Sequence, residues 1–167
     1  MNPNTNVPFQ ASKKIDVTHV VIESTKPFAG VQASLEALIP PIDDEISILL
    51  RAGISERLRQ KLEAGPELAI FLKRDHGALV RLYGEPRQAV QYEIGNPLTA
   101  STMTRYRLAA GLYAPLRVVL YENDHGGSRF EYDLPSSLFD QFGDERITEV
   151  ARGLDSALAR ALSRAAS

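Results

Sequence analysis

The chain of 167 residues contains no cysteine. This absence excludes a disulfide framework, a thiolate metal site, a covalently attached c-type haem and a cysteine nucleophile. It also fits a reducing compartment. Residues 1–14 are polar and lack the apolar core of a signal peptide, so we expect them to form a flexible tail of a soluble, cytoplasmic protein.

An excess of one charge and a long apolar run are also missing. The 19 Lys and Arg residues nearly balance the 21 Asp and Glu residues, which gives a formal net charge of −2. Without a global basic field we expect no nucleic-acid partner. No apolar run approaches the roughly 20 residues that cross a bilayer, so we expect no membrane partner.

The signatures of many catalytic and cofactor sites are absent as well. The sequence has no GxSxG, P-loop or GxGxxG pattern. Its three histidines, His19, His76 and His125, lie far apart and show no HxxxH or HExxH spacing, so we expect neither a metal site nor a cofactor. The sequence identifies no reaction, and whether the protein is an enzyme stays open.

The remaining composition, 44% hydrophobic and 24% charged, is typical of one globular domain. Apolar spacing and turn residues first predict a strand over 15–24, a helix over 25–39 and two short helices within 42–64, the second marked by Ile54, Leu58 and Leu62. A strand over 68–72, a brief helix over 75–84, a strand over 87–94 and a short helix from 96 are expected to follow. The chain is predicted to end with a hairpin of strands 116–122 and 128–134 and a long helix over 144–165. The unbroken apolar run at 68–72 is typical of a central strand buried on both faces.

The hairpin can be predicted residue by residue. If it closes symmetrically around 123–127, the pairs on the apolar face are Leu120–Phe130, Val118–Tyr132 and Leu116–Leu134, and those on the other face are Tyr121–Arg129, Val119–Glu131 and Arg117–Asp133. A slip of one residue would mix the two faces, so the register is well specified. Tyr132 is therefore expected in the core.

This order of elements favours an α+β domain over residues 15–165. We expect a single mixed, mainly antiparallel sheet, with helices packed largely on one face and a long C-terminal helix. Residues 40–66 are predicted to be an extra helical insertion in that domain.

Two polar motifs occupy structurally demanding positions at strand ends. Asp75 is expected to cap the helix that follows it, whereas His76 is a candidate acid, base or ligand-binding residue. Asn96 precedes a proline and is pushed toward the extended geometry of an N-cap. The same helix start offers free N–H groups to an anion, and Thr99 and Thr102 add hydroxyls.

Arg117 lies inside an apolar strand, which is costly unless its guanidinium is paired. The predicted register supplies Asp133 as a partner, and an anionic ligand is the alternative. His19 is expected to be structural, and His125 belongs to the hairpin turn. The candidate ligand-binding residues are His76, Asn96, Thr99, Thr102 and Arg117.

Several of these segments resemble the bacterial domain-of-unknown-function family 302 over roughly residues 67–138. The segments that carry the resemblance are Asp75-His76, Gly95-Asn96-Pro97, Met103, Pro115-Leu116-Arg117-Val118, Tyr121-Glu122, Tyr132-Asp133 and Pro135-Ser136-Ser137. The resemblance implies a compact α+β subunit that self-associates, with no settled activity.

Three functions stay open at this point. The first hypothesis is a cytoplasmic small-molecule-binding or sensing domain, a homodimer with a small anionic ligand near His76, Asn96 and Arg117. The second is an enzyme with His76 as general acid or base. The third is a protein-protein interaction module, which an exposed stripe of Ile46, Leu50, Ile54 and Leu58 would favour.

Overall fold

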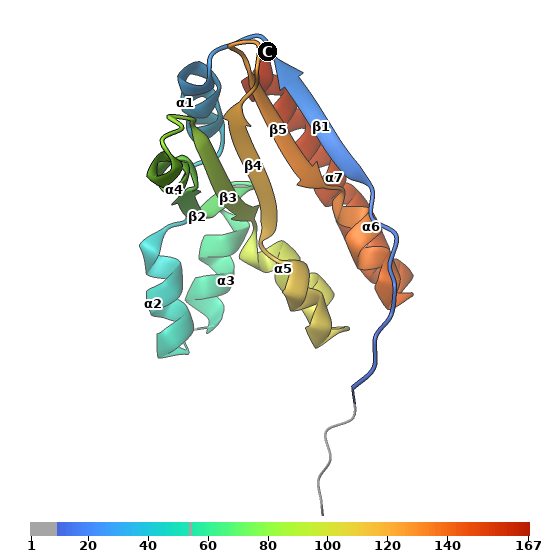
Figure 1. The fold of residues 1–167 in the computed structure, drawn as a ribbon. Coiled ribbons are helices and arrows are strands. Elements are labelled where there is room, and N and C mark those ends of the chain that lie inside the picture. The colour runs from blue at the N-terminus through green and yellow to red at the C-terminus, as the bar shows by residue number, and fades with distance from the viewer. Residues whose placement is uncertain (1–9, 54) are drawn as a thin grey trace, which may run out of the picture.

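The structure, a computed structural model, describes residues 10–53 and 55–167 (Figure 1). These residues form one five-stranded antiparallel sheet in the order β1-β5-β4-β3-β2. The strands are β1 (His19–Ser24), β2 (Ala69–Asp75), β3 (Ala89–Gly95), β4 (Leu116–Glu122) and β5 (Ser128–Asp133). The only parallel pairing among the described residues is an isolated bridge between Pro41 and Ile70. The predicted α+β class is confirmed.

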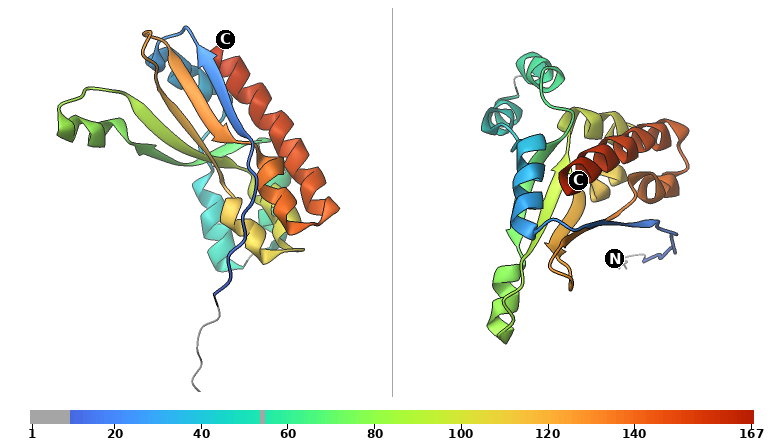
Figure 2. Two further views of the ribbon diagram at one scale, coloured as in Figure 1. Left: turned by 45° about the vertical axis from the view of Figure 1, so that its right-hand side comes forward. Right: turned by 90° about the horizontal axis from the view of Figure 1, so that it is seen from above.

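The helices lie mainly on one face of the sheet (Figure 2). The α-helices are α1 (Phe28–Leu38), α2 (Asp44–Ala52), α3 (Ser55–Glu63), α4 (Gly77–Val80), α5 (Pro97–Thr104), α6 (Pro135–Phe139) and α7 (Glu145–Ala166), and the short 3₁₀ helices are η1 (Arg81–Tyr83), η2 (Leu108–Tyr113) and η3 (Asp140–Phe142). Ile54, predicted to belong to the second short helix of the 42–64 segment, lies outside the described residues. Within the described part of the chain, no helix combines the length and apolarity that a membrane span needs.

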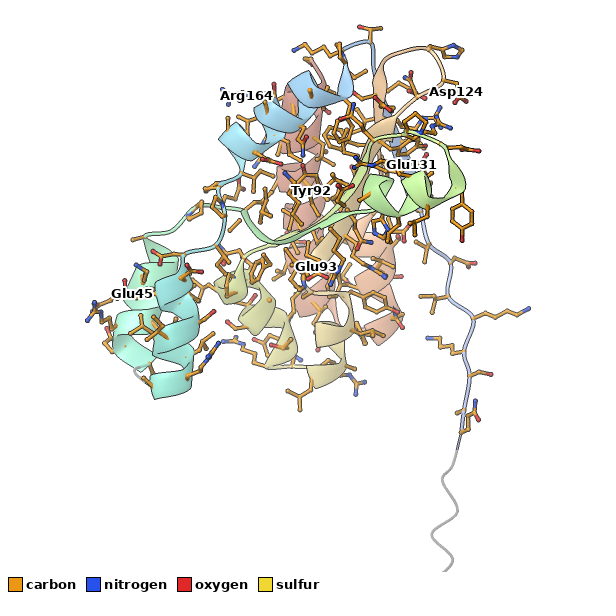
Figure 3. All side chains as sticks on the ribbon, turned by 60° about the vertical axis from the view of Figure 1, so that its left-hand side comes forward. Glu45, Tyr92, Glu93, Asp124, Glu131 and Arg164 are labelled. Atoms are coloured by element: carbon orange, nitrogen blue, oxygen red, sulfur yellow. The ribbon has the colours of Figure 1, made fainter. Side chains whose placement is uncertain are left out.

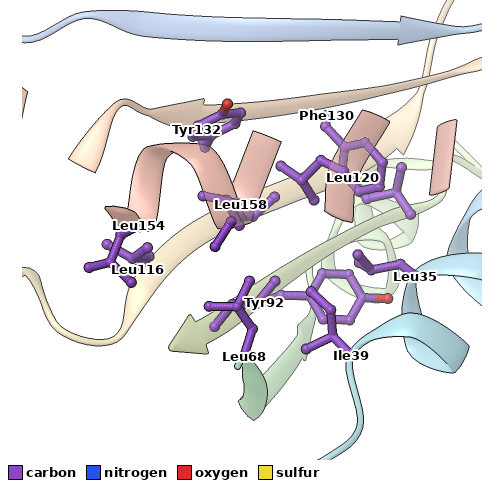
Figure 4. Packing of buried hydrophobic residues seen from close by; sticks show 14 of the residues in the cluster. Leu35, Ile39, Leu68, Tyr92, Leu116, Leu120, Phe130, Tyr132, Leu154 and Leu158 are labelled. Carbon is purple, nitrogen blue, oxygen red and sulfur yellow. The ribbon is translucent and has the colours of Figure 1, made fainter. Parts of the chain in front are cut away.

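The core lies between the sheet and helices α1 and α7 (Figure 4). The hairpin has the predicted register, with Leu120 opposite Phe130 and Val118 opposite Tyr132. These side chains are buried, and Leu158 of α7 packs into the same cluster. The partition of apolar residues to one face therefore fixed the strand pairing, as expected for a sheet that is covered on one side.

The prediction of a central strand at 68–72 was wrong. The strand there is β2, which lies at one edge of the sheet, and of its residues only Ala69 is buried. Its pairing with β3 shifts between Ile70 and Leu72, and Leu72 is 41% exposed. The apolar run was misleading because, at the edge of the sheet, Ile70 and Phe71 are only partly buried and Leu72 is exposed. The first strand is also shorter than predicted and begins at His19.

The end of β2 and the start of β3, with α4 and η1 between them, project from the body of the molecule (Figure 2). We call residues 73–91 the hairpin arm. Its tip exposes three large apolar side chains, Leu79 at 59%, Leu82 at 79% and Tyr83 at 86%. These are unusually exposed for such residues, because large apolar side chains are normally buried.

Candidate functional site

The turn between β3 and α5 is built by Asn96. Its backbone is extended, with φ −141° and ψ 124°, and its Oδ1 accepts hydrogen bonds from the N–H groups of Leu98 (2.8 Å) and Thr99 (3.1 Å). Its Nδ2 donates to the carbonyl of Pro66 at 3.0 Å. The predicted N-cap is confirmed. Because Asn96 itself occupies two of the free N–H groups, this helix start is poorly suited to an anion.

A small cavity of about 100 Å³, which we call the inner pocket, lies on one side of this turn. Its walls come from β2, the end of β3, α5, the segment before β4, α6 and α7. The lining residues are Phe71, Gly95, Asn96, Pro97, Thr99, Ala100, Met103, Ala114, Pro115, Leu116, Phe139 and Leu154. The lining is mostly apolar. Thr99 adds a hydroxyl that has no hydrogen-bond partner within residues 10–53 and 55–167. The inner pocket therefore offers a small apolar space with one polar group.

A larger cavity of about 290 Å³, the outer pocket, lies on the other side of the turn. It is lined by α2, α3 and the segments around them, through Pro40, Pro41, Ile42, Asp43, Ile46, Lys61, Leu62, Ala64, Gly65, Pro66, Ala69, Asn96 and Pro97. Asn96 and Pro97 thus line both pockets.

Among the described residues, Lys61 is the one cation that lines the outer pocket, and it is already neutralised. The Lys61 Nζ lies 2.7 Å from Asp43 and 2.6 Å from Glu45, and the hydrogen bonds that Lys61 donates to these two carboxylates raise its pKa. Glu45 also pairs with Arg57 at 2.6 Å. The carboxylates of Asp43 and Glu45 therefore balance the cations Lys61 and Arg57, and the part of the chain that the structure describes leaves no unpaired cation at this rim for an anionic ligand.

His76 does not belong to either pocket. It follows the far end of β2, is exposed, and lies six rungs of the β2–β3 ladder away from Asn96. At about 3.3 Å per residue this separation is roughly 20 Å. The neighbouring Asp75 accepts a hydrogen bond from the N–H of Ala78 at 2.8 Å, so its predicted capping role is confirmed.

Arg117 lies on the face of the sheet opposite the helices, and it is exposed. Its predicted ion pair with Asp133 is not formed among the described residues. Asp133 instead contacts the Nδ1 of His19 at 2.9 Å, and Glu93, the neighbour of Arg117 on β3, pairs with Arg74 at 2.6 Å. The cause is that β1 and β2, the outer strands, supply closer partners for both acids.

The structure therefore brings together only part of the predicted set. Asn96 and Thr99 line the inner pocket, whereas Thr102 lies further along α5 and donates from its hydroxyl to the carbonyl of Thr99 at 2.7 Å. His76 and Arg117 lie away from the inner pocket and away from each other. Sequence reasoning missed Phe71, Phe139 and Leu154, because apolar residues in helices and strands look alike whether they line a cavity or fill a core.

The open face of the sheet, by which we mean the face without helices, carries a separate polar cluster. The two ring nitrogens of His19 contact Asp133 at 2.9 Å and Glu131 at 3.1 Å. Glu131 also accepts a hydrogen bond from Tyr121. Figure 3 shows Glu131 far from Glu45, which lies beside the outer pocket. Within the described residues no group of His, Asp and Glu is arranged to hold a metal ion. The cluster joins β1 to β5, in agreement with the structural role predicted for His19.

Comparison with known proteins places the fold. A model of the family described as "Domain of unknown function DUF302" matches residues 52–165. The crystal structure of an uncharacterized conserved DUF302 protein from Bacillus stearothermophilus superimposes with a TM-score of 0.64. The two chains are 17% identical, and the match covers 88% of this chain and 97% of that one. At this identity the likeness concerns the fold alone. No curated protein matches the chain.

Proposed function

Since the chain belongs to the DUF302 family, whose description names no activity, we propose its function from its own site: it is a small-molecule-binding domain that takes a neutral, mostly apolar ligand in the inner pocket. One observation carries the proposal. Segments distant in sequence, around Asn96, Pro115, Phe139 and Leu154, surround one hollow instead of closing it. Interiors are normally packed to the density of organic crystals, so a hollow with walls from six segments calls for an occupant.

The size of the inner pocket sets the size of the ligand group. An apolar cavity of about 150 Å³ holds benzene, so a cavity of about 100 Å³ takes a group of about four or five heavy atoms. Thr99 supplies the hydrogen bond that fixes its orientation. The ligand is neutral because Asn96 covers the start of α5 and because no charged side chain of the described residues lines the inner pocket. For these pockets a neutral ligand replaces the anion expected from the sequence.

Propanamide and propanoate test this proposal, because they have the same shape and differ in charge. We expect amide-resonance shifts at Thr99, Ala100 and Leu116 to saturate with propanamide and to be several-fold weaker with propanoate. Ala100→Leu should abolish the shifts by filling the pocket. Ser101→Leu adds the same side chain on the exposed side of α5 and should leave them unchanged. Equal shifts in the two variants, or a preference for propanoate, would contradict the proposal.

A second function, self-association through the hairpin arm, is favoured by the arm's own surface. Leu82 and Tyr83 are 79% and 86% exposed at the end of a projecting element, next to the edge strand β2. Removing such side chains from water favours association, because it takes apolar surface out of contact with the solvent. A second copy of the chain is the partner that we propose, because unpaired edge strands pair readily with one another.

Light scattering after size-exclusion chromatography tests this second function. We expect the wild-type protein to be a dimer and Leu82→Lys to be a monomer. Leu108→Lys introduces the same charge at an equally exposed leucine of η2, outside the arm, and should remain a dimer. A monomeric wild-type protein, or dissociation by Leu108→Lys alone, would rule out the arm as the interface.

A further inference from the structure

A third hollow, of about 290 Å³, lies between the end of α1, the segment 66–68 and α7, and we call it the α1–α7 groove. It is lined by Leu38, Ile39, Pro66, Glu67, Leu68, Ala157, Arg160, Ala161 and Arg164. Its floor is apolar, since Ile39, Leu68 and Ala157 are buried at 1%, 6% and 4% exposure. Its rim is charged. The groove therefore combines two properties that the inner pocket does not.

The rim carries one uncompensated positive charge. Arg160 and Arg164 are four residues apart on α7, so they lie on the same face of that helix. Arg160 donates to both carboxylate oxygens of Glu67, at 2.9 and 3.1 Å. Arg164 makes no ion pair or hydrogen bond from its side chain within residues 10–53 and 55–167, and it lies at the end of α7 that passes α1 (Figure 3). Two guanidinium groups and one carboxylate leave a net charge of +1.

We propose that the α1–α7 groove binds an amphipathic carboxylate, with the aliphatic chain on the apolar floor and the carboxylate on Arg164. The planar guanidinium fork matches the two oxygens of a carboxylate, and the pair of parallel hydrogen bonds is stronger than a neutral one. A single negative charge suits the net charge of the rim, whereas a doubly charged phosphate would be left with an excess. This site is independent of the inner pocket and of the neutral ligand proposed there.

Hexanoate and hexanamide test the inference with matched chains. We expect millimolar hexanoate to shift the amide resonances of Leu68, Ala157 and Ala161, and hexanamide to bind about tenfold more weakly, because it lacks the charge-assisted hydrogen bonds. Arg164→Gln should weaken hexanoate by a similar factor without affecting hexanamide. Arg152→Gln removes the same charge from α7 outside the groove and should change neither affinity.

Three results would overturn the inference. The first is the absence of saturable shifts at the groove with hexanoate. The second is equal binding of hexanoate and hexanamide, which would leave the carboxylate without a role. The third is equal weakening by Arg164→Gln and Arg152→Gln, which would show that only the overall charge matters. Because the shifts at Leu68 and Ala157 are separate from those at Thr99 and Ala100, failure here is distinguishable from failure of the inner-pocket proposal.

Discussion

Tyr92 connects the core to the surface of the molecule. Its ring is fully buried between α1 and the sheet, and its hydroxyl donates to Glu36 at 2.8 Å (Figure 4). Burial and the neighbouring carboxylate both raise the pKa of Tyr92, so the phenol stays protonated and keeps donating. Glu36 of α1 also accepts from Lys73 of β2, so this one carboxylate joins α1 both to β3 and to the edge strand β2.

Removing the Tyr92 hydroxyl should destabilise the protein more than removing a tyrosine hydroxyl that makes no hydrogen bond. We expect Tyr92→Phe to lower the free energy of unfolding by about 1 kcal/mol, the usual contribution of a partly buried hydrogen bond. Tyr132→Phe is the matched control, because Tyr132 is buried to 4% exposure and its hydroxyl has no hydrogen-bond partner in the described part of the chain. Urea unfolding of the two variants measures the difference. Equal losses would mean that the bond to Glu36 contributes nothing specific.

His19 should make the stability depend on pH. Its hydrogen bonds to Asp133, and then to Glu131, raise its pKa in the folded protein. These hydrogen bonds are at full strength when the imidazole ring is protonated. Their contribution to the free energy of unfolding is therefore complete below the ordinary histidine pKa of about 6.5, and it is lost as the pH rises through the higher pKa of the folded protein. The side chain is 52% exposed, so each pair contributes only about 0.2–1 kcal/mol.

The measurement is the difference in the free energy of unfolding between wild type and His19→Asn, followed from pH 5 to pH 9. We expect the wild-type advantage to shrink with rising pH. His76→Asn is the control, because His76 is exposed and has no side-chain partner among the residues that the structure describes. A wild-type advantage over His19→Asn that grows with pH would contradict this reading of the cluster.

At the scale of elements, the β4–β5 hairpin fits closely against the end of β1. A Cβ atom built at Gly127 would lie 2.2 Å from the carbonyl oxygen of Ser24 and 3.2 Å from the Cα of Thr25, both of which are backbone atoms. Gly153, on the exposed side of α7, would meet nothing within 4 Å. Glycine is therefore required by close approach at the first position and not at the second.

Alanine at the two positions should act with opposite signs. Gly127→Ala forces the turn away from β1 and should lower the free energy of unfolding by about 1–3 kcal/mol, as overpacking does. Gly153→Ala should raise it by about 0.5–1 kcal/mol, because alanine favours the helix. Thermal or chemical denaturation checks both. A neutral Gly127→Ala would mean that the hairpin and β1 are not in contact as described.

Much of the secondary structure and of the strand pairing was predictable from the sequence, because local residue patterns determine them. The alternation of apolar residues fixed the pairing of Leu120 with Phe130, and Asn96 before proline marked the start of α5. The position of β2 was not predictable in the same way. An apolar run such as 68–72 reports that its side chains are partly buried, but it does not report which strand lies beside it.

At the scale of the whole molecule, the candidate site was predictable only in part. In an antiparallel sheet, successive strands end at opposite sides, so His76 after β2 and Asn96 after β3 could not share a site. Arg117 follows a buried leucine on β4, and the alternation of side chains places it on the open face. The inner pocket also needs Phe139 and Leu154, whose apolar character gives no sign of a cavity.

The central claim is that the inner pocket binds a neutral small molecule, and intermolecular nuclear Overhauser effects test it most directly. With propanamide bound, we predict contacts between the ligand's methyl protons and the methyl groups of Thr99, Ala100 and Met103, which line the pocket. Ala100→Leu should remove these contacts. Saturable binding whose contacts map to any other surface, or no binding at all, would contradict the claim.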